Sequence, residues 1–386
     1  MSQAPDSSLR TETLDWVPIV ATIAMMGVFA VTMGLTYPLL SLVLESRGTS
    51  SLLIGLNAAM TPVGIIVSAP FIPGLAARFG AWRMSVFFLL ATSATLLLLG
   101  SFQSLAAWFL LRFLLGIFID GLFIVSETWI NQMATRATRG RMMGLYTTVL
   151  ASGFAIGPFV VGLTGSAGWA AFLVGAAAPM LVLPLLLMVK GRVPEFSREE
   201  KASILAFAPH APLLLAAVAV MALFDSAALS LMPIYGLEHG LTEATAAAAV
   251  GVLVAGNVVF QFPIGWLADK VHRRMLMVVC TLLTIAGCFA VPLVIGDSLL
   301  RWPLLFLWGA MAFGVYPVAM AEMGDRFSGS MLLAGNAAFA VMWGCGGIVG
   351  APSVGGAMEL IGPNGLPYTL ALCYSGFLVT LLLRRS

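Results

Sequence analysis

The sequence predicts an all-α membrane protein with twelve transmembrane helices in two pseudo-symmetric six-helix bundles. Three observations predict this fold: the abundance of apolar residues, the placement of the lysines and arginines, and an internal repeat. Hydrophobic residues make up 60% of the 386 residues and charged residues only 9%, against roughly 25% charged residues in soluble domains. A water-soluble fold of this size could not hide so much apolar surface. The apolar runs are also too long and too even for the strands of a membrane barrel.

The transmembrane spans are delimited by charge clusters, by proline and glycine turns and by the length that a helix needs to cross a bilayer. The predicted spans are 17–44, 52–74, 84–103, 105–133, 142–164, 167–189, 210–236, 244–267, 275–295, 299–322, 330–357 and 365–384. We expect residues 1–16 to form a cytoplasmic tail and residues 190–209 a cytoplasmic linker. The linker joins a first bundle at 17–189 to a second at 210–386.

The basic residues predict the orientation of these spans. Of the 19 lysines and arginines, 16 fall in segments on the side of the amino terminus, Arg47 and Arg301 fall on the other side, and Arg112 lies within a span. Cytoplasmic loops carry the excess of lysine and arginine, so both termini are expected in the cytoplasm. The four cysteines have neither metal spacing nor the pattern of a disulfide framework,. We expect no cofactor, no metal and no nucleic-acid partner.

The two halves of the sequence resemble each other at an offset near 194 residues. The repeated landmarks are Pro38 and Pro233, Glu127 and Glu322, Gly157-Pro158 and Gly350-Ala351-Pro352, and the loops after spans 2 and 8. Duplicated six-helix halves are typical of secondary transporters, whose substrate site lies between the halves near the middle of the bilayer.

The loop after span 8, which reads GWLADKVHRR at 265–274, resembles the Gly-x-Leu-Ala-Asp-Arg-x-Gly-Arg-Arg element of the major facilitator superfamily (MFS). The matching positions include Gly265, Asp269, Arg273 and Arg274. The loop after span 2 keeps Arg78 and Gly80 but has Ala77 where the family has aspartate. The resemblance implies that this aspartate caps a neighbouring helix in one transport state, so we expect an ionic contact only in the second half. A plain positively charged loop is the alternative.

Two further motifs carry the resemblance. Arg112 and Gly116 match an Arg-x-x-x-Gly element associated with proton-coupled members, although a structural pairing of Arg112 is the alternative,. The residues Gly153, Gly157, Pro158 and Gly162 match the family's antiporter element, with Val161 replacing one glycine. Ordinary helix packing is the alternative for these small residues. The segment from Ser126 to Asn131 resembles that of a largely uncharacterised bacterial branch, which has Glu-Ser-Trp-x-Asn.

Five ionisable residues lie within predicted spans, on spans 4, 7 and 10. They are Arg112, Asp120, Glu127, Asp225 and Glu322. The resemblance implies that spans 1, 4, 7 and 10 line a central cavity, so these residues are candidates for proton coupling or substrate binding. We expect Asp120 and Asp225 to be the main proton or cation sites, with Arg112 as a mobile partner. A permanent structural bridge between Asp225 and Arg112 is the alternative.

Other residues are expected to line the cavity with apolar or hydrogen-bonding groups. They are Phe29, Met33, Tyr37, Trp129, Asn131, Phe224, Ser226, Asn257, Gln261, Asn336 and Trp343. Single asparagine or glutamine residues in membrane helices more often bond between helices than to a ligand.

The resulting hypothesis is a proton-coupled antiporter that exports a small neutral or cationic amphipathic compound from the bacterial cytoplasm. We expect a monomer in the inner membrane whose partners are the substrate, protons and the lipid bilayer. A proton-coupled nutrient importer on the same fold is the first alternative, and a non-transporting sensor is a weaker one. The sequence offers no catalytic constellation, so we expect no enzymatic activity.

Overall fold

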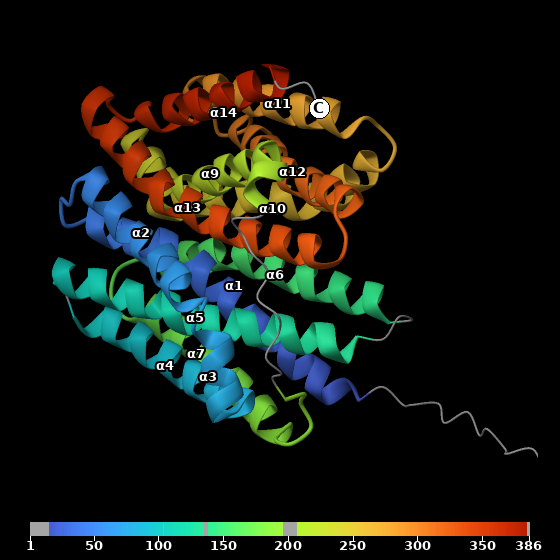
Figure 1. Cartoon of the computed structure of the whole chain (residues 1–386). Coiled ribbons are helices and arrows are strands. Elements are labelled where there is room, and N and C mark those ends of the chain that lie inside the picture. The colour runs from blue at the N-terminus through green and yellow to red at the C-terminus, as the bar shows by residue number, and fades with distance from the viewer. Residues whose placement is uncertain (1–14, 103, 135–137, 196–206, 384–386) are drawn as a thin grey trace, which may run out of the picture.

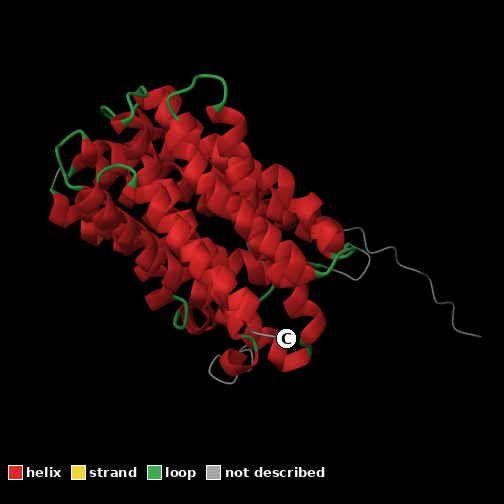
Figure 2. Ribbon diagram, turned by 90° about the horizontal axis from the view of Figure 1, so that it is seen from above, coloured by secondary structure: helices red, strands yellow, loops and turns green. Residues whose placement is uncertain are grey.

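The computed structural model describes residues 15–102, 104–134, 138–195 and 207–383. The parts of the chain described are helical and contain no strand (Figure 2). The helices are α1 (Trp16–Glu45), α2 (Ser51–Ser68), α3 (Ile72–Phe79), α4 (Ala81–Ser101), α5 (Leu105–Met133), α6 (Arg139–Thr164), α7 (Ala170–Met188), the short 3-10 helix η1 (Ala208–His210), α9 (Pro212–Glu238), α10 (Glu243–Ala268), α11 (Arg273–Val294), α12 (Arg301–Arg326), α13 (Gly329–Ile361) and α14 (Gly365–Leu383). Twelve of them are long and apolar enough to cross a membrane, which confirms the predicted number of spans.

The helices form two bundles that follow each other along the chain (Figure 1). In the first half α1 packs against α5, α6 and α7, and α4 packs against α5 and α7. In the second half α9 packs against α12, α13 and α14, and α11 packs against α12 and α14. Most of the expected tail (residues 1–14) and part of the expected linker (residues 196–206) lie outside the described residues.

The two halves meet along two equivalent seams, α2 against α13 and α6 against α10 (Figure 1). A carboxylate of the second half crosses each seam at the end of the bundle where α1 finishes and α2 begins, which we call the contact end. Glu359 accepts a hydrogen bond from the backbone nitrogen of Leu52 at 2.9 Å, and Glu243 accepts one from the backbone nitrogen of Ser166. The opposite end, where α5 finishes, is called the far end.

Glycines set the distance between α2 and α5 in the first half. A Cβ added at Gly116 would lie 2.2 Å from the carbonyl oxygen of Thr61, and one added at Gly64 would be equally close to the backbone of α5. Gly256 and Gly309 make the same close approach between α10 and α12, at offsets of 192 (256 − 64) and 193 (309 − 116). The repeat therefore preserves a close backbone contact between two helices in each half. In the first half, Gly116 of the Arg-x-x-x-Gly element lies at this contact.

The loop after span 2 differs from the prediction. The span was expected to reach residue 74, but α2 ends at Ser68 and a separate short helix, α3, follows. Pro70 has no backbone N–H to continue the hydrogen-bond ladder of α2, and Pro73 is placed in the first turn of α3, where proline is tolerated,. Gly80 then joins α3 to α4 at a φ of 88°, a conformation that glycine adopts without strain,.

Candidate functional site

Arg112 is fully buried on α5 near the contact end. Its Nη1 donates a hydrogen bond to Oδ1 of Asn57 on α2 at 3.1 Å, and its guanidinium carbon lies 5.0 Å from the ring centre of Tyr37 on α1. Its Nε and Nη2 atoms are buried without a hydrogen-bond partner among the described residues, as is the Oγ1 atom of Thr61 one turn beyond Asn57. The cation is therefore held by one hydrogen bond and one aromatic ring, without a carboxylate.

Asp225 lies on α9, in the other half. Tyr37 lies close enough to both Arg112 and Asp225 for their charges to act on its phenol. Within the described chain Asp225 forms no ion pair, and its side chain is partly exposed. Its neighbours are fixed in the bundle: Ser226 donates a hydrogen bond to the carbonyl oxygen of Gly347 at 2.8 Å. Tyr37 thus lies in the electrostatic range of a base of its own half and an acid of the other half.

Asp120 occupies a different position from Asp225. Its side chain is buried and accepts a hydrogen bond from the hydroxyl of Ser68 on α2 at 2.8 Å. It lies one turn from Gly116, on the side of α5 that packs against α2. The hydrogen-bond partner of Asp120 therefore belongs to a helix of its own half.

Glu127 and Glu322 hold corresponding places in the repeat but have different surroundings. Glu322 on α12 forms an ion pair with Arg326 at 3.0 Å. Glu127 on α5 is exposed, and its charge acts on the phenols of Tyr146 on α6 and Tyr316 on α12. Within the part of the chain that is described, the first half thus presents a carboxylate without an ion pair where the second half presents a neutralised one.

The remaining residues expected in the cavity fall into two groups. Three of them pack inside their own half: Phe29 stacks on Phe123 at 5.1 Å, Trp129 donates a hydrogen bond to the carbonyl oxygen of Pro194 at 3.0 Å, and Phe224 stacks edge-on against Trp308 at 4.9 Å. Met33 is also buried. The second group is exposed or partly exposed and comprises Asn131, Asn257, Gln261, Asn336 and Trp343.

The charged loop of the second half makes several contacts at the far end. Arg273 donates to the carbonyl oxygen of Ala321 at 2.9 Å and forms an ion pair with Asp325 at 2.6 Å, while its distance to Asp269 is 3.9 Å. Arg274 donates to the carbonyl oxygen of Leu381 at 3.0 Å.

The loop of the first half contains no corresponding ion pair among its described residues. There the guanidinium of Arg78 lies over the ring of Phe79, at 5.3 Å from its centre. Gly265, which belongs to the element in the second half, lies within α10.

The glycines of the antiporter-like element have two kinds of neighbour. Gly153 and Gly157 bring α6 against Ala30 and Gly34 of α1, within the first half, and Pro158 lies buried between them and the contact end. Gly162 instead faces α10, where a Cβ would lie 3.3 Å from the carbonyl oxygen of Ala244. The element therefore combines packing inside the first half with one position on the seam.

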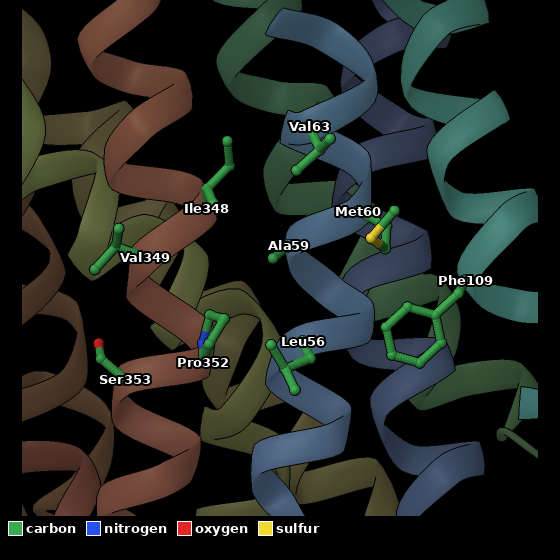
Figure 3. A pocket seen from close by; sticks show the side chains of 9 residues that line it. All are labelled: Leu56, Ala59, Met60, Val63, Phe109, Ile348, Val349, Pro352 and Ser353. Atoms are coloured by element: carbon green, nitrogen blue, oxygen red, sulfur yellow. The ribbon is translucent and has the colours of Figure 1, made fainter. Parts of the chain in front are cut away.

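An apolar groove of about 600 Å³ runs over the other seam (Figure 3). Its lining comes from α2, from α13 and from Phe109 of α5. Leu56, Met60 and Ile348 are among its side chains, and Ser353 supplies a hydroxyl. The groove is built by both halves, so its shape depends on how they are packed together.

Several partners of the ionisable residues expected in the site were not predicted from the sequence. Asn57, Ser68, Tyr146 and Tyr316 were not among the expected site residues, although they contact or face Arg112, Asp120 and Glu127. Asparagine and serine within a membrane helix are a signal for interhelical bonding. The two tyrosines carry no such signal, because their proximity to Glu127 arises from the packing of three helices.

Twelve membrane spans in two repeated halves define a membrane transporter that binds a small-molecule substrate within the bilayer,. The family model for the Major Facilitator Superfamily matches residues 21–351. The chain belongs to this superfamily.

Relatives agree with this assignment. The MFS-type transporter YfkF of Bacillus subtilis (strain 168) is 27% identical over 375 residues, which cover 94% of each chain. An MFS-type transporter of Enterobacter sp. (strain 638) is 27% identical over 279 residues, or 71% of each chain.

Solved structures share the fold at low sequence identity. A bacterial homologue of the human lysosomal transporter Spinster, in an inward-facing and occupied conformation, matches with a TM-score of 0.78 and 14% identity over 94% of each chain. A point mutant of the nucleoside transporter NupG matches with a TM-score of 0.76 and 15% identity, covering 94% of this chain and 98% of its own.

Proposed function

We propose that this transporter is a monomeric, proton-coupled antiporter in the bacterial cytoplasmic membrane. It exports a small neutral or cationic amphipathic compound by alternating access. The observation that carries this proposal is the arrangement of Arg112, Tyr37 and Asp225. The buried guanidinium lies 5.0 Å from the centre of the Tyr37 ring, and the partly exposed Asp225 of the other half is near enough for its charge to act on the same phenol.

Proton coupling follows from the charges in this arrangement. An ionised Asp225 attracts Arg112 across the interface and favours the conformation that brings the two side chains together. A proton on Asp225 removes that attraction and favours their separation. Because a ligand shifts an equilibrium by its differential affinity for the two states, proton binding and the movement of the halves are coupled in both directions.

The sign of the intramembrane charge favours a neutral or cationic substrate. Four acids and one base lie within the spans, whereas a polyanion would require several lysines or arginines along its path,. Glu322 is neutralised by Arg326, so the uncompensated acids are Asp120, Glu127 and Asp225.

The orientation and direction of transport rest on the sequence. The positive-inside pattern supports cytoplasmic termini, which makes the far end cytoplasmic and the contact end external. The antiporter-like element at 153–162 supports export. A nutrient importer on the same fold is the alternative, and the direction of substrate movement under an imposed proton gradient separates the two.

The experiment uses energised inverted membrane vesicles that contain the protein and a fluorescent dye reporting acidity. A transported compound releases protons and restores the fluorescence of the native protein. Asp225→Asn is expected to abolish this response while leaving expression and thermal stability unchanged. Asp297→Asn is the matched control, because Asp297 is an aspartate in the loop between α11 and α12, outside the spans. An unchanged response in Asp225→Asn overturns the coupling mechanism, and proton uptake in place of release overturns antiport.

A further inference from the structure

Glu127 is an exposed carboxylate on a membrane helix. It lies six residues before the end of α5 (133 − 127), and its carboxylate forms no ion pair within the described chain. A charge on a membrane helix is costly unless it is paired, hydrated or bound to a ligand. Because the side chain is exposed, water or a ligand can reach this carboxylate.

Two phenols from different halves lie within range of the charge of Glu127. Tyr146 belongs to α6 of the first half, and its hydroxyl lies 3.2 Å from that of Ser126. Tyr316 belongs to α12 of the second half and lies beside Phe339, at 6.3 Å between ring centres. The charge of Glu127 acts on both phenols. The carboxylate thus has one phenol of each half in its electrostatic environment, and that of Tyr146 is bonded to the neighbouring Ser126.

The surroundings deeper along α5 are apolar and aromatic. Phe123 lies one turn from Glu127 on the same face of the helix, because residues four apart share a face. Phe123 stacks on Phe29 at 5.1 Å, and Phe29 contacts Phe154 at 6.1 Å. A ligand bound at Glu127 would therefore meet an apolar wall on the side towards the contact end.

Neutralisation by a neighbouring arginine, which explains Glu322, does not explain Glu127. Glu322 has Arg326 four residues later on α12, whereas residue 131, four after Glu127, is an asparagine. Asn131 donates its side-chain hydrogen bond to the backbone oxygen of Glu127, at 2.9 Å, and not to its carboxylate. The repeat thus shows where a cation stands in the second half, and among the described residues the corresponding position of the first half is an asparagine.

We propose that Glu127, Tyr146 and Tyr316 form a binding site for an organic cation, an ammonium or phosphonium centre that carries apolar groups. The carboxylate supplies the opposite charge, the two rings supply cation–π attraction, and the phenylalanines accommodate the apolar groups. This inference names the substrate class of the proposed exporter and rests on that proposed function. Because the site is built by both halves, a bound cation contacts both bundles that move during transport.

The test measures equilibrium binding to the purified full-length protein in lipid nanodiscs. The probe is tetraphenylphosphonium, and the matched probe of opposite charge is tetraphenylborate, which has the same shape. The native protein is expected to bind the phosphonium and to bind the borate at least tenfold more weakly. Glu127→Gln is expected to weaken phosphonium binding at least tenfold, and Glu127→Asp, which keeps the charge, is expected to retain most of it.

Glu322→Gln is the matched control, since it makes the same chemical change at the repeat-related position. Its phosphonium affinity is expected to stay within about twofold of the native value. The inference is overturned if the native protein does not bind the phosphonium, if the borate binds equally well, or if Glu127→Gln binds like the native protein. It is also overturned if Glu322→Gln is as defective as Glu127→Gln.

The same preparations distinguish this inference from the proposed antiport. Asp225→Asn is expected to bind tetraphenylphosphonium while it fails to exchange protons in vesicles. Cation binding that depends on Glu127, in a native protein that exchanges no protons, would contradict the antiport mechanism and retain the cation site. Proton exchange that is unaffected by Glu127→Gln, in a protein that does not bind the phosphonium, would contradict the cation site and retain the antiport mechanism.

Discussion

Trp82 makes in the first half the contact that Arg274 makes in the second. The indole nitrogen of Trp82 donates a hydrogen bond to the carbonyl oxygen of Leu186 at 2.8 Å, and Arg274 donates to that of Leu381 at 3.0 Å. The donors are separated by 192 residues (274 − 82) and the acceptors by 195 (381 − 186). Each contact ties the start of the third span of a half to the last turn of its sixth. The repeat has kept the hydrogen bond and changed the residue that makes it.

The contact of Trp82 is expected to stabilise the first half. Trp82→Phe keeps an aromatic ring beneath Lys190, which lies 5.3 Å from the ring centre of Trp82, but removes the donor. The loss of one hydrogen bond costs about 1 kcal/mol, so the unfolding temperature in detergent is expected to fall by a few degrees. Trp82→Arg is expected to recover part of the loss, because the second half uses arginine there. A Trp82→Phe protein as stable as the native one would contradict this role.

Asn57 is expected to be necessary for holding Arg112 in place. Asn57→Leu removes the one hydrogen bond that Arg112 makes among the described residues, and leaving a charged donor unsatisfied costs about 1.5–3 kcal/mol. Thr61→Val is the matched control on the same helix, because the hydroxyl of Thr61 is buried without a partner among the described residues. Its replacement by an isosteric apolar group is expected to be neutral or stabilising. Thermal unfolding of both variants measures the difference, and the opposite ranking would refute the assignment.

Gly116 is expected to tolerate no side chain. Gly116→Ala places a Cβ against the backbone of Thr61, and overpacking of this kind typically costs about 1–3 kcal/mol. Gly144→Ala in α6 is the control, since a Cβ there meets no atom within 4 Å and alanine favours the helix by about 1 kcal/mol. The expected result is a lower unfolding temperature for the first variant and an equal or higher one for the second. Equal stability of the two variants would exclude a close α2–α5 contact.

Glu359 and Glu243 are expected to favour the conformation in which the halves touch at the contact end. Replacing both with alanine removes their bonds to the backbone nitrogens of Leu52 and Ser166. Spin labels at Ala77 and Lys270, in the loops of the two halves at the far end, report the distance between the halves by pulsed electron paramagnetic resonance. The double variant is expected to increase the population with a shorter distance by about tenfold, equivalent to about 1.4 kcal/mol. An unchanged distance distribution would show that the two carboxylates do not bias the conformation.

The sequence predicted the spans better than the contacts between them. Span 4 was predicted at 105–133 and α5 has those bounds, because charged and polar residues end its apolar run. The end of α2 was wrong by six residues, since apolar residues continue through the prolines that break the helix.

The direction in which each side chain points was harder to predict. In a membrane helix the side that faces lipid and the side that faces other helices are both apolar, so little amphipathic pattern remains. For this reason the bonds of Asp120 to Ser68 and of Arg112 to Asn57 emerged only from the structure.

The two carboxylates at the contact end have backbone nitrogens as partners. Every residue except proline offers such a nitrogen, so the side chains at positions 52 and 166 can vary without losing these bonds. Glu243 and Glu359 themselves have no such freedom, because the acceptor oxygens belong to their side chains. The tolerance of these two bonds to mutation is therefore unequal: changes of side chain at positions 52 and 166 leave them intact, and a single substitution at Glu243 or Glu359 removes one of them. Ser50 is the exception in the first half, because its side chain also bonds to Glu359.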